Sequence, residues 1–449
     1  MTAGHSRDRL VLTAGTMGLS SSLFVSLLVL GGCVQLLLRT DVERVAKQIA
    51  VSRVGGSHCS IQTSKVESLP SSTSFANECA AVGLSLDGVA NGSRSDVEKY
   101  IALLYRLSER TDSELPPITN KTAPPMDPID CSAPMFAGER STPATVIDLM
   151  PFNGEFVAVE VRLYELLDLV DMHIVLESPS SHHMFRKPLV LARRMEYLQD
   201  FWDKIFLLYD DDSDVQNAFG DRFNSENKYP SKVDWRMEGR MRPLIWRKAK
   251  AFVKHLNATS NGIVYISGDP DEIPDRNMIN HFKHCKPARP QFSYKYHQIM
   301  YRHNFQFVTK GWDHGSVFGG INNPDQTRKP NLLRDGKDLA PVKWTGFHLN
   351  RVTDVYVDFA KELTISEGGS LAGIGRACSQ SGNITEALLN PLLCNQRRNH
   401  GSRICCKDYP GLSVSSVPDP RPEKYRLPWI VEQNRDHFWP YFPPFAPEE

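Results

Sequence analysis

The stretch "TVIDLMPFNGEFVAVEVRLYELLDLVDMHIVLES", residues 145–178, decides the fold class because its apolar residues change their spacing twice. "TVIDLM" is a short apolar run, "NGEFVAVEVRLYELLDLV" has helical spacing behind Asn153 as the expected N-cap, and "DMHIVLES" is again a strand-like run. A strand, a helix and a second strand in this order predict two parallel strands joined by a crossover helix.

The alternation continues beyond residue 178. "KPLVLARRMEYLQDF" and "WRKAKAFVKHLN" have helical spacing, whereas "KIFLLYD" and "GIVYIS" are typical of buried strands. We therefore expect an α/β fold in which a mostly parallel sheet is flanked by helices. Sheets of this kind bind ligands at the carboxyl ends of their strands.

The string "SGDPDEIP", which begins at the end of "GIVYIS", carries three carboxylates, those of Asp269, Asp271 and Glu272. In an extended segment Asp269 and Asp271 would point to the same side, where they could share Mg²⁺ or Mn²⁺. An ion held by so few side chains keeps positions open for a diphosphate. The alternative is a polar turn that caps a helix starting after Pro274.

The charge balance and the absent motifs exclude several classes of protein. Lys plus Arg and Asp plus Glu are both 52, so the net charge of zero gives no general attraction to nucleic acid, and we expect no nucleic-acid partner. The sequence contains no P-loop, no G-x-G-x-x-G after a strand, no G-x-S-x-G and no H-E-x-x-H. The carboxylate string is therefore the best candidate for a functional site.

The N-terminal region predicts a membrane anchor. Residues 10–38 contain no charged side chain and are long enough to cross a bilayer. We expect one uncleaved anchor there, with residues 1–9 as a cytoplasmic tail, and a cleaved signal peptide is the alternative. The rest of the chain would then be lumenal, as is favoured by four N-x-Ser/Thr sequons at Asn91, Asn120, Asn257 and Asn383.

The cysteines are compatible with that compartment. Besides Cys33, which lies in the apolar run, the chain has an even set that could form disulfides or stay free in the core. This set consists of Cys59, Cys79, Cys131, Cys285, Cys378, Cys394, Cys405 and Cys406.

Several motifs together resemble glycosyltransferase family 17 over about residues 145–366. They occur in the family's order: "VIDLMPFNGEFVAVEVRLYELLDLVDMHIVLES", "RKPLVL", "SGDPDEIP", "YKYHQIMYRHNFQF", Trp312 and "WTGFHLN". The resemblance implies a GT-A-like fold and a β-1,4-mannosyl-glycoprotein 4-β-N-acetylglucosaminyltransferase activity. Such an enzyme is a single-pass type II protein of the Golgi membrane. It moves GlcNAc from UDP-GlcNAc, with inversion, to the core β-mannose of N-glycosylated glycoprotein acceptors.

The resemblance also implies roles for individual residues. The expected ligands of Mn²⁺ (or Mg²⁺) are Asp269, Asp271 and His348. The expected contacts of the UDP-sugar are Glu177, Lys187, Asp269, Asp271, Glu272 and Arg334. The candidates for the general base are Asp313 and Glu367.

Plainer roles stay open for these residues. Glu177 could cap a helix or join a salt bridge, His348 could be a core histidine, and Lys187 and Arg334 could be solvated surface cations. For the whole chain, the alternatives are a GT-A-type transferase with another donor or acceptor, or a non-catalytic glycan-binding protein of the same fold.

The chain is divided accordingly. Residues 39–144, rich in Ser and Pro, are predicted to be a stem that contains one helix over "DVEKYIALLYRLSER", and a small accessory domain is the alternative. Residues 145–410 are predicted to form the catalytic domain. Residues 411–449 are predicted to be a Pro-rich C-terminal extension.

The lumenal placement predicts N-glycosylation. In a eukaryotic secretory host, Asn257 or the stem sequons at Asn91 and Asn120 should carry glycans, so an N-glycan-removing enzyme should increase the electrophoretic mobility of the chain. An unchanged mobility would count against the lumenal placement.

Overall fold

The structure is a computed structural model that describes residues 72–113, 115–210, 236–255, 262–302, 306–320, 336, 338–341, 343–364 and 427–438. The predicted anchor, the sequons at Asn257 and Asn383, and most of the cysteines lie outside these residues. Within them, no helix is both long and apolar enough to cross a bilayer. The other two sequons are described, and Asn91 and Asn120 are both exposed, as a glycan acceptor must be.

A seven-stranded sheet forms the centre of the fold, with the strand order β12-β8-β11-β5-β2-β3-β4. Strands β4, β3, β2 and β5 pair in parallel, whereas β11 is antiparallel to both of its neighbours, so the sheet is mixed. The strands are β2 (Thr145–Phe152), β3 (Met172–Glu177), β4 (Ile205–Tyr209), β5 (Ile263–Ser267), β8 (Phe292–Lys295), β11 (Ser316–Gly319) and β12 (Asp338–Leu339).

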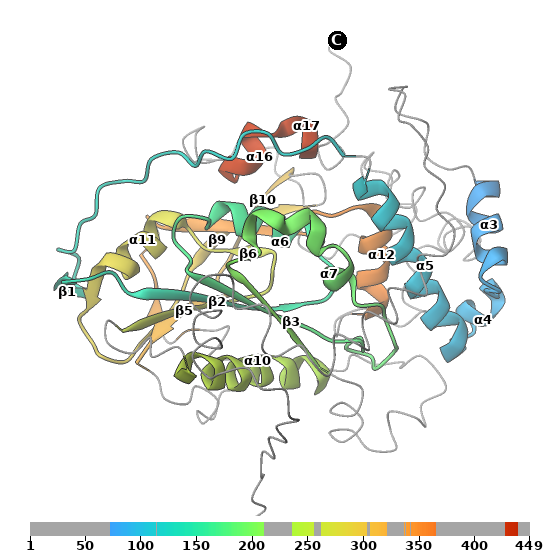
Figure 1. Cartoon of the computed structure of the whole chain (residues 1–449), viewed down its shortest axis with the longest axis horizontal. Coiled ribbons are helices and arrows are strands. Elements are labelled where there is room, and N and C mark those ends of the chain that lie inside the picture. The colour runs from blue at the N-terminus through green and yellow to red at the C-terminus, as the bar shows by residue number, and fades with distance from the viewer. Residues whose placement is uncertain are drawn as a thin grey trace, which may run out of the picture. The chain divides into compact units, whose positions relative to one another are not determined.

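Helices cover both faces of this sheet, which confirms the predicted α/β class (Figure 1). Helix α10 (Arg236–His255) lies on one face, and α6 (Phe156–Glu165) lies on the other. Strand β2 serves both layers, because Ile147 and Leu149 pack with the apolar residues of α10 whereas Met150 packs in the cluster that contains α6. A strand covered on both faces explains the nearly continuous apolar run in its sequence.

Two local expectations were wrong. The N-cap position of α6 is Glu155, without a side-chain cap bond, and the Asn153 side-chain NH2 group donates to Thr364 Oγ1 at 3.0 Å. The single helix predicted over residues 187–201 is a four-residue α7 (Val190–Arg193) followed by a 3₁₀ helix, η1 (Met195–Phe201).

A second sheet has the order β10-β9-β13-β6, and its strand β6 lies at the end of the carboxylate string. Its strands are β6 (Glu272–Ile273), β9 (His297–Arg302), β10 (Gln306–Trp312) and β13 (Thr345–Asn350). Between β6 and β9 the chain forms α11 (Arg276–His284) and β7 (Cys285–Pro287), and β7 pairs with β1 (Phe136–Glu139). A disulfide joins Cys131 to Cys285, so the segment before β1 is linked covalently to this region.

The predicted stem helix is real, but it is part of the main core. Helices α3 (Ser72–Ala81), α4 (Leu86–Ala90) and α5 (Arg94–Ser113) precede the first sheet, and α12 (Val355–Thr364) lies beside α5. Tyr100, Ile101, Leu104 and Tyr105 of α5 are fully buried in the same apolar cluster as residues of α6 and α12. No separation of cores therefore marks the boundary predicted at residue 145.

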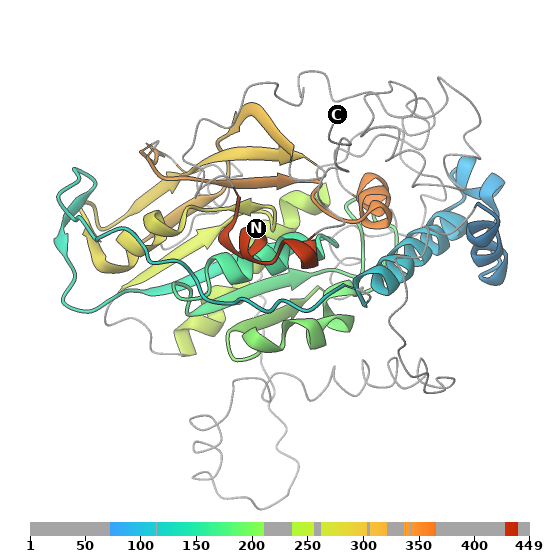
Figure 2. The same ribbon diagram turned by 90° about the horizontal axis from the view of Figure 1, so that it is seen from above.

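The two segments that flank the family-like region meet on α6. Residues 115–135 run from α5 toward β1 past the C-terminal helices α16 (Trp429–Gln433) and α17 (Arg435–Phe438) (Figure 2). Asn434 Oδ1 accepts the backbone N–H groups of Thr119 and Asn120 at 3.0 and 2.9 Å. Glu165 of α6 accepts the backbone N–H of Trp429 at 3.0 Å. Helix α6 is thus bonded to the C-terminal segment, which in turn binds the predicted stem region.

The burial of α5 predicts that residues before 128 are needed for folding. A chain that starts at residue 115 keeps the disulfide but loses at least these four fully buried side chains, each worth about 1.5–3 kcal/mol. That loss approaches the whole net stability of a typical domain, about 5–15 kcal/mol. With the same cleavable signal peptide added to both, we expect a chain starting at residue 72 to be secreted and to unfold cooperatively in a thermal melt, and the shorter chain to fail. Equal secretion and equal melting temperatures would show that α5 is dispensable.

Candidate active site

The carboxylate string forms a turn after β5 rather than an extended segment. The Glu272 N–H donates to the Asp269 carbonyl oxygen at 2.9 Å, which closes a four-residue turn with Pro270 at its second position, where Pro is favoured. The expectation that Asp269 and Asp271 point to the same side was based on extended backbone and is wrong. The capping alternative is also wrong for both residues, because Asp275 is the N-cap of α11 and accepts the Met278 N–H at 3.0 Å.

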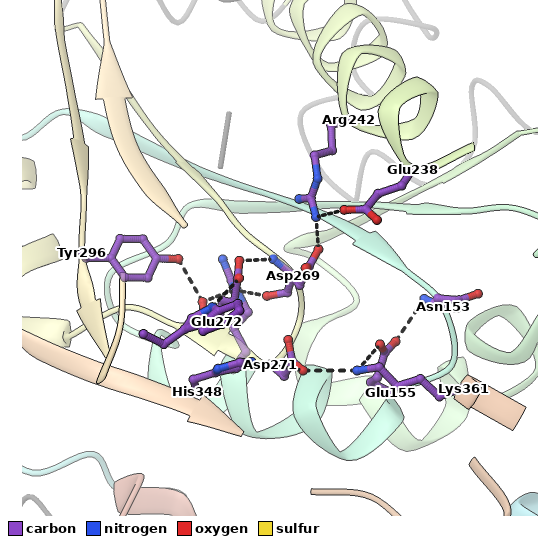
Figure 3. A network of polar contacts seen from close by, with 12 residues as sticks. Asn153, Glu155, Glu238, Arg242, Asp269, Asp271, Glu272, Tyr296, His348 and Lys361 are labelled. Atoms are coloured by element: carbon purple, nitrogen blue, oxygen red, sulfur yellow. Dashed lines mark hydrogen bonds and ion pairs between the residues drawn. The ribbon is translucent and has the colours of Figure 1, made fainter. Parts of the chain in front are cut away.

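Asp269 is bound from the α10 side of the turn (Figure 3). Its Oδ1 accepts from Arg242 Nη2 at 2.6 Å, and Arg242 also contacts Glu238 of the same helix at 3.3 Å. The Asp269 side chain keeps 27% of its surface exposed. An ion or ligand that approached this carboxylate would have to share it with Arg242.

Asp271 is bound by different partners and is buried. Its Oδ2 lies 3.2 Å from Lys361 Nζ of α12 and 3.7 Å from His348 Nε2 of β13. Lys361 also contacts Glu155 Oε1 at 2.9 Å, so this ammonium group bridges two carboxylates (Figure 3). Burial alone would raise the pKa of Asp271, but Lys361 and His348 outweigh it and hold this pKa well below its usual range. Asp271 is therefore an anion at neutral pH.

Glu272 is fully buried and braces the turn. Its Oε2 accepts the Asp269 N–H at 2.9 Å and its Oε1 accepts the Trp312 indole N–H at 2.9 Å. The Trp312 ring stacks on the His348 ring with centroids 4.7 Å apart. Glu272 therefore orients Trp312 against His348, and both of its carboxylate oxygens are already used by the protein.

His348 reaches the turn because β13 pairs with β6, which places His348 directly opposite Glu272. The imidazole is buried, and its Nδ1 has no hydrogen-bond partner among the described residues. Leu349, the next residue, donates its N–H to the Asp271 carbonyl oxygen at 2.8 Å. The sequence prediction that Asp271 and His348 act at one place agrees with this geometry.

Two further residues predicted to contact the UDP-sugar, Glu177 and Lys187, lie outside the turn. Glu177 takes the capping alternative, because its carboxylate accepts the backbone N–H groups of Val190, Leu191 and Ala192, the first residues of α7, at 2.5, 3.1 and 3.3 Å. Lys187 is buried, and its Nζ has no hydrogen-bond partner among the described residues.

Of the two base candidates, one is described. Asp313 is 44% exposed and accepts from His297 Nδ1 at 2.7 Å. Glu367 lies outside the described residues, as does Arg334, which was predicted to contact the UDP-sugar.

Three buried polar residues behind the turn were missed from the sequence. Asp148 of β2, Arg162 of α6 and His173 of β3 are fully buried, and the Asp148 carboxylate bonds both of the others. Arg162 also donates to the carbonyl oxygens of Asp269 and Glu272 at 2.9 and 2.6 Å. The available signal was an Asp inside the apolar run "TVIDLM" and an Arg inside the apolar helix "FVAVEVRLYE". A charge buried in each of two adjacent elements indicates an ion pair between them.

The loop that carries Glu155 is set by α5. The Tyr105 hydroxyl donates to the Asn153 carbonyl oxygen at 2.9 Å. Gly154 adopts φ +111°, and a Cβ there would lie 2.5 Å from the Tyr105 hydroxyl oxygen. Only glycine fits between this ring and the backbone, so a residue of the predicted stem shapes the loop whose Glu155 holds Lys361.

The donor atoms limit what the site could hold. Among the residues that the structure describes, no three His, Cys, Asp or Glu side chains are grouped closely enough to bind a metal ion. Asp271 and His348 are nevertheless a carboxylate and an imidazole 3.7 Å apart. With metal–ligand bonds of about 2.1 Å, two donors to one ion can be up to roughly 4 Å apart. This pair therefore fits an ion with two protein ligands and open positions for an anionic substrate, without Asp269.

Residues 128–319 match the family model described as Glycosyltransferase family 17. The match contains β2 to β5, α6 and the whole turn, and it ends before β13, so His348 lies outside it. No curated protein and no solved structure gave a significant match to the chain.

Replacing Asp271 by Asn should now affect stability as well as function. The structure buries Asp271 against Lys361. Removing the charge leaves this ammonium group with Glu155 alone, which should cost about 1–3 kcal/mol of unfolding free energy. Asp275→Asn is the matched control, since Asn caps a helix about as well as Asp. Denaturant unfolding of both variants checks this, and equal stabilities would contradict the Asp271–Lys361 contact.

Proposed function

Since residues 128–319 belong to glycosyltransferase family 17, we propose that the chain transfers GlcNAc from UDP-GlcNAc to the core β-mannose of N-glycans. The product would be a β-1,4 linkage, formed with inversion in a metal-dependent reaction. The observation that supports this best is that the family segment contains the turn, and that β13 brings His348 to within 3.7 Å of Asp271 in that turn. Four adjacent parallel strands with helices on both faces support the GT-A-like fold that the family implies.

The donor diphosphate is proposed to bind at the Asp271 side of the turn. Asp271 and His348 would hold Mn²⁺ or Mg²⁺, which when bound would neutralise the charge of the leaving diphosphate. Trp312 keeps the His348 ring in place by stacking on it. Lys361 contacts the Asp271 carboxylate from the other side. Its ammonium group would be a second positive charge beside the diphosphate.

Lys187 is the proposed cation for the rest of the donor. Its ammonium group interacts electrostatically with the carboxylates of Glu177 and Glu155. Glu155 in turn binds Lys361, which contacts Asp271. Burial lowers the pKa of Lys187, and its Nζ is without a hydrogen-bond partner in the described part of the chain. A phosphate oxygen would supply the acceptor that this buried ammonium group lacks.

Asp313 is the proposed general base. It follows Trp312, whose ring stacks on His348, and its carboxylate is partly exposed and bonded to His297. The reaction would be a single displacement in which the carboxylate takes the proton from the mannose hydroxyl as that oxygen attacks the anomeric carbon. UDP would leave from the opposite face of the sugar, which gives inversion.

The proposed location is the Golgi lumen, with residues 10–38 as a type II anchor. The Cys131–Cys285 disulfide supports an oxidising compartment. The exposed sequons at Asn91 and Asn120 agree with the same side of the membrane.

The activity is tested by incubating the full-length chain with UDP-GlcNAc, Mn²⁺ and a biantennary N-glycan, followed by mass spectrometry and linkage analysis of the product. We expect one added HexNAc, linked β-1,4 to the core mannose, and loss of product with a chelator. The Asp313→Asn variant should bind UDP normally but lose turnover, because only the proton acceptor is removed.

Other outcomes would identify the alternatives. Product formation only with a different UDP- or GDP-sugar would show a transferase of other specificity. Glycan binding without turnover on any donor would show a non-catalytic protein. Product that forms equally well with a chelator present would overturn the metal-dependent mechanism, and would leave Lys361 as the cation beside the diphosphate.

A further inference from the structure

One guanidinium group, that of Arg162, contacts both ends of the turn that carries Asp271. Its Nη1 donates to the Asp269 carbonyl oxygen at 2.9 Å and to the Glu272 carbonyl oxygen at 2.6 Å. These are the first and the last residues of the turn. The Tyr296 hydroxyl adds a second bond to the Glu272 carbonyl at 2.9 Å (Figure 3).

The guanidinium is itself held from behind. Arg162 Nε and Nη2 donate to the two oxygens of Asp148 at 2.8 and 2.6 Å, a paired geometry that fixes the plane of the group. His173, the direct neighbour of Asp148 across the β2–β3 pair, bonds Asp148 Oδ2 at 3.0 Å. All three side chains are fully buried.

The buried Asp148–Arg162 ion pair is not explained by stability alone, because buried ion pairs add little to the free energy of unfolding. Removing two charges from water costs several kcal/mol per ion, and apolar replacements of similar size are often equally stable or better. Burial favours the neutral form of Asp148, but Arg162 and His173 outweigh it and lower its pKa to about 2. What an apolar pair could not supply is the two N–H bonds to the turn.

We propose that Arg162 is a positioning residue that sets the turn 269–272, and through it the Asp271 carboxylate, at the distance from His348 needed to bind a divalent cation with a nucleoside diphosphate. This inference rests on the proposed function of the site. Arg162 itself touches neither the ion nor the donor, since it contacts only the carbonyl side of the turn.

The test compares two variants of the full-length chain, with UDP binding measured by calorimetry at a series of Mn²⁺ concentrations. Arg162→Lys keeps the positive charge but cannot contact Asp148 and both carbonyls at once. The second variant combines Asp148→Asn with Arg162→Met, which removes both buried charges and keeps an acceptor for His173. We expect Mn²⁺-dependent UDP affinity to fall about 10–100-fold in both variants, the usual effect of losing an outer-shell partner.

The matched control is Arg194→Lys. Arg194 is equally buried, but it donates to Ser108 of α5 and lies over the Phe156 ring. We expect this variant to lose stability while keeping its Mn²⁺-dependent UDP affinity. Hydrogen exchange gives a local readout, because the Asp269 and Glu272 amides, both bonded within the turn, should exchange faster in the Arg162 variants and not in the control.

The possible outcomes distinguish a failure of the proposed function from a failure of the positioning role of Arg162. If the unmodified chain binds UDP no better with Mn²⁺ than without it, the proposed function fails, whatever Arg162 does. If it does bind better, and either Arg162 variant stays folded with unchanged affinity, the positioning role is overturned. Equal losses of affinity in the Arg162 variants and in Arg194→Lys would also overturn it, because they would show a general effect of destabilisation.

Discussion

The contact between Asp148 and Arg162 is the interaction on which the geometry of the site depends. It joins the central strand β2 to the crossover helix α6, and the free side of the guanidinium then bonds the turn that follows β5. Three elements far apart in the sequence are thereby held at one point. Because the pair is fully desolvated, any shift of the turn would leave a buried donor or carbonyl unpaired, which costs about 1–3 kcal/mol per group. We therefore expect the turn to be rigid, although it lies at the end of a strand, where loops are usually mobile.

A second chain of contacts reaches the same turn from the N-terminal helices. Tyr105 of α5 bonds the loop after β2, Glu155 of that loop binds Lys361, and Lys361 binds Asp271. Asp271 is thus approached from α12 on one side and from β13 on the other. A region that precedes the family match therefore contributes to the shape of the site, and the predicted stem has a structural role beyond spacing the domain from a membrane.

The sequence predicted the fold well where the signal was periodic. Strands β2 to β5 and helix α5 lie where their apolar spacing placed them, because their apolar residues pack in the core and the pattern is strong. It failed where a single contact decided the outcome. Asn153 looks like a helix cap, yet its amide bonds Thr364, more than two hundred residues away. Glu177 and Glu272 were predicted to contact a ligand, yet each carboxylate accepts hydrogen bonds from N–H groups of the protein itself. Which N–H groups lie near a carboxylate depends on the tertiary structure and not on residue type. The Asp269–Arg242 contact and the bonds from Arg162 to the turn are likewise tertiary, and no spacing in the sequence encodes them.

We propose that Asp271 and His348 hold one divalent ion against the donor diphosphate. Pulsed electron paramagnetic resonance of Mn²⁺ bound to the full-length chain with UDP tests this most directly, since it detects nitrogen and phosphorus nuclei next to the ion. We expect a nitrogen coupling together with phosphorus couplings, and loss of the nitrogen coupling in His348→Gln. A spectrum with phosphorus couplings but no nitrogen coupling, or a nitrogen coupling that survives in His348→Gln, would contradict it.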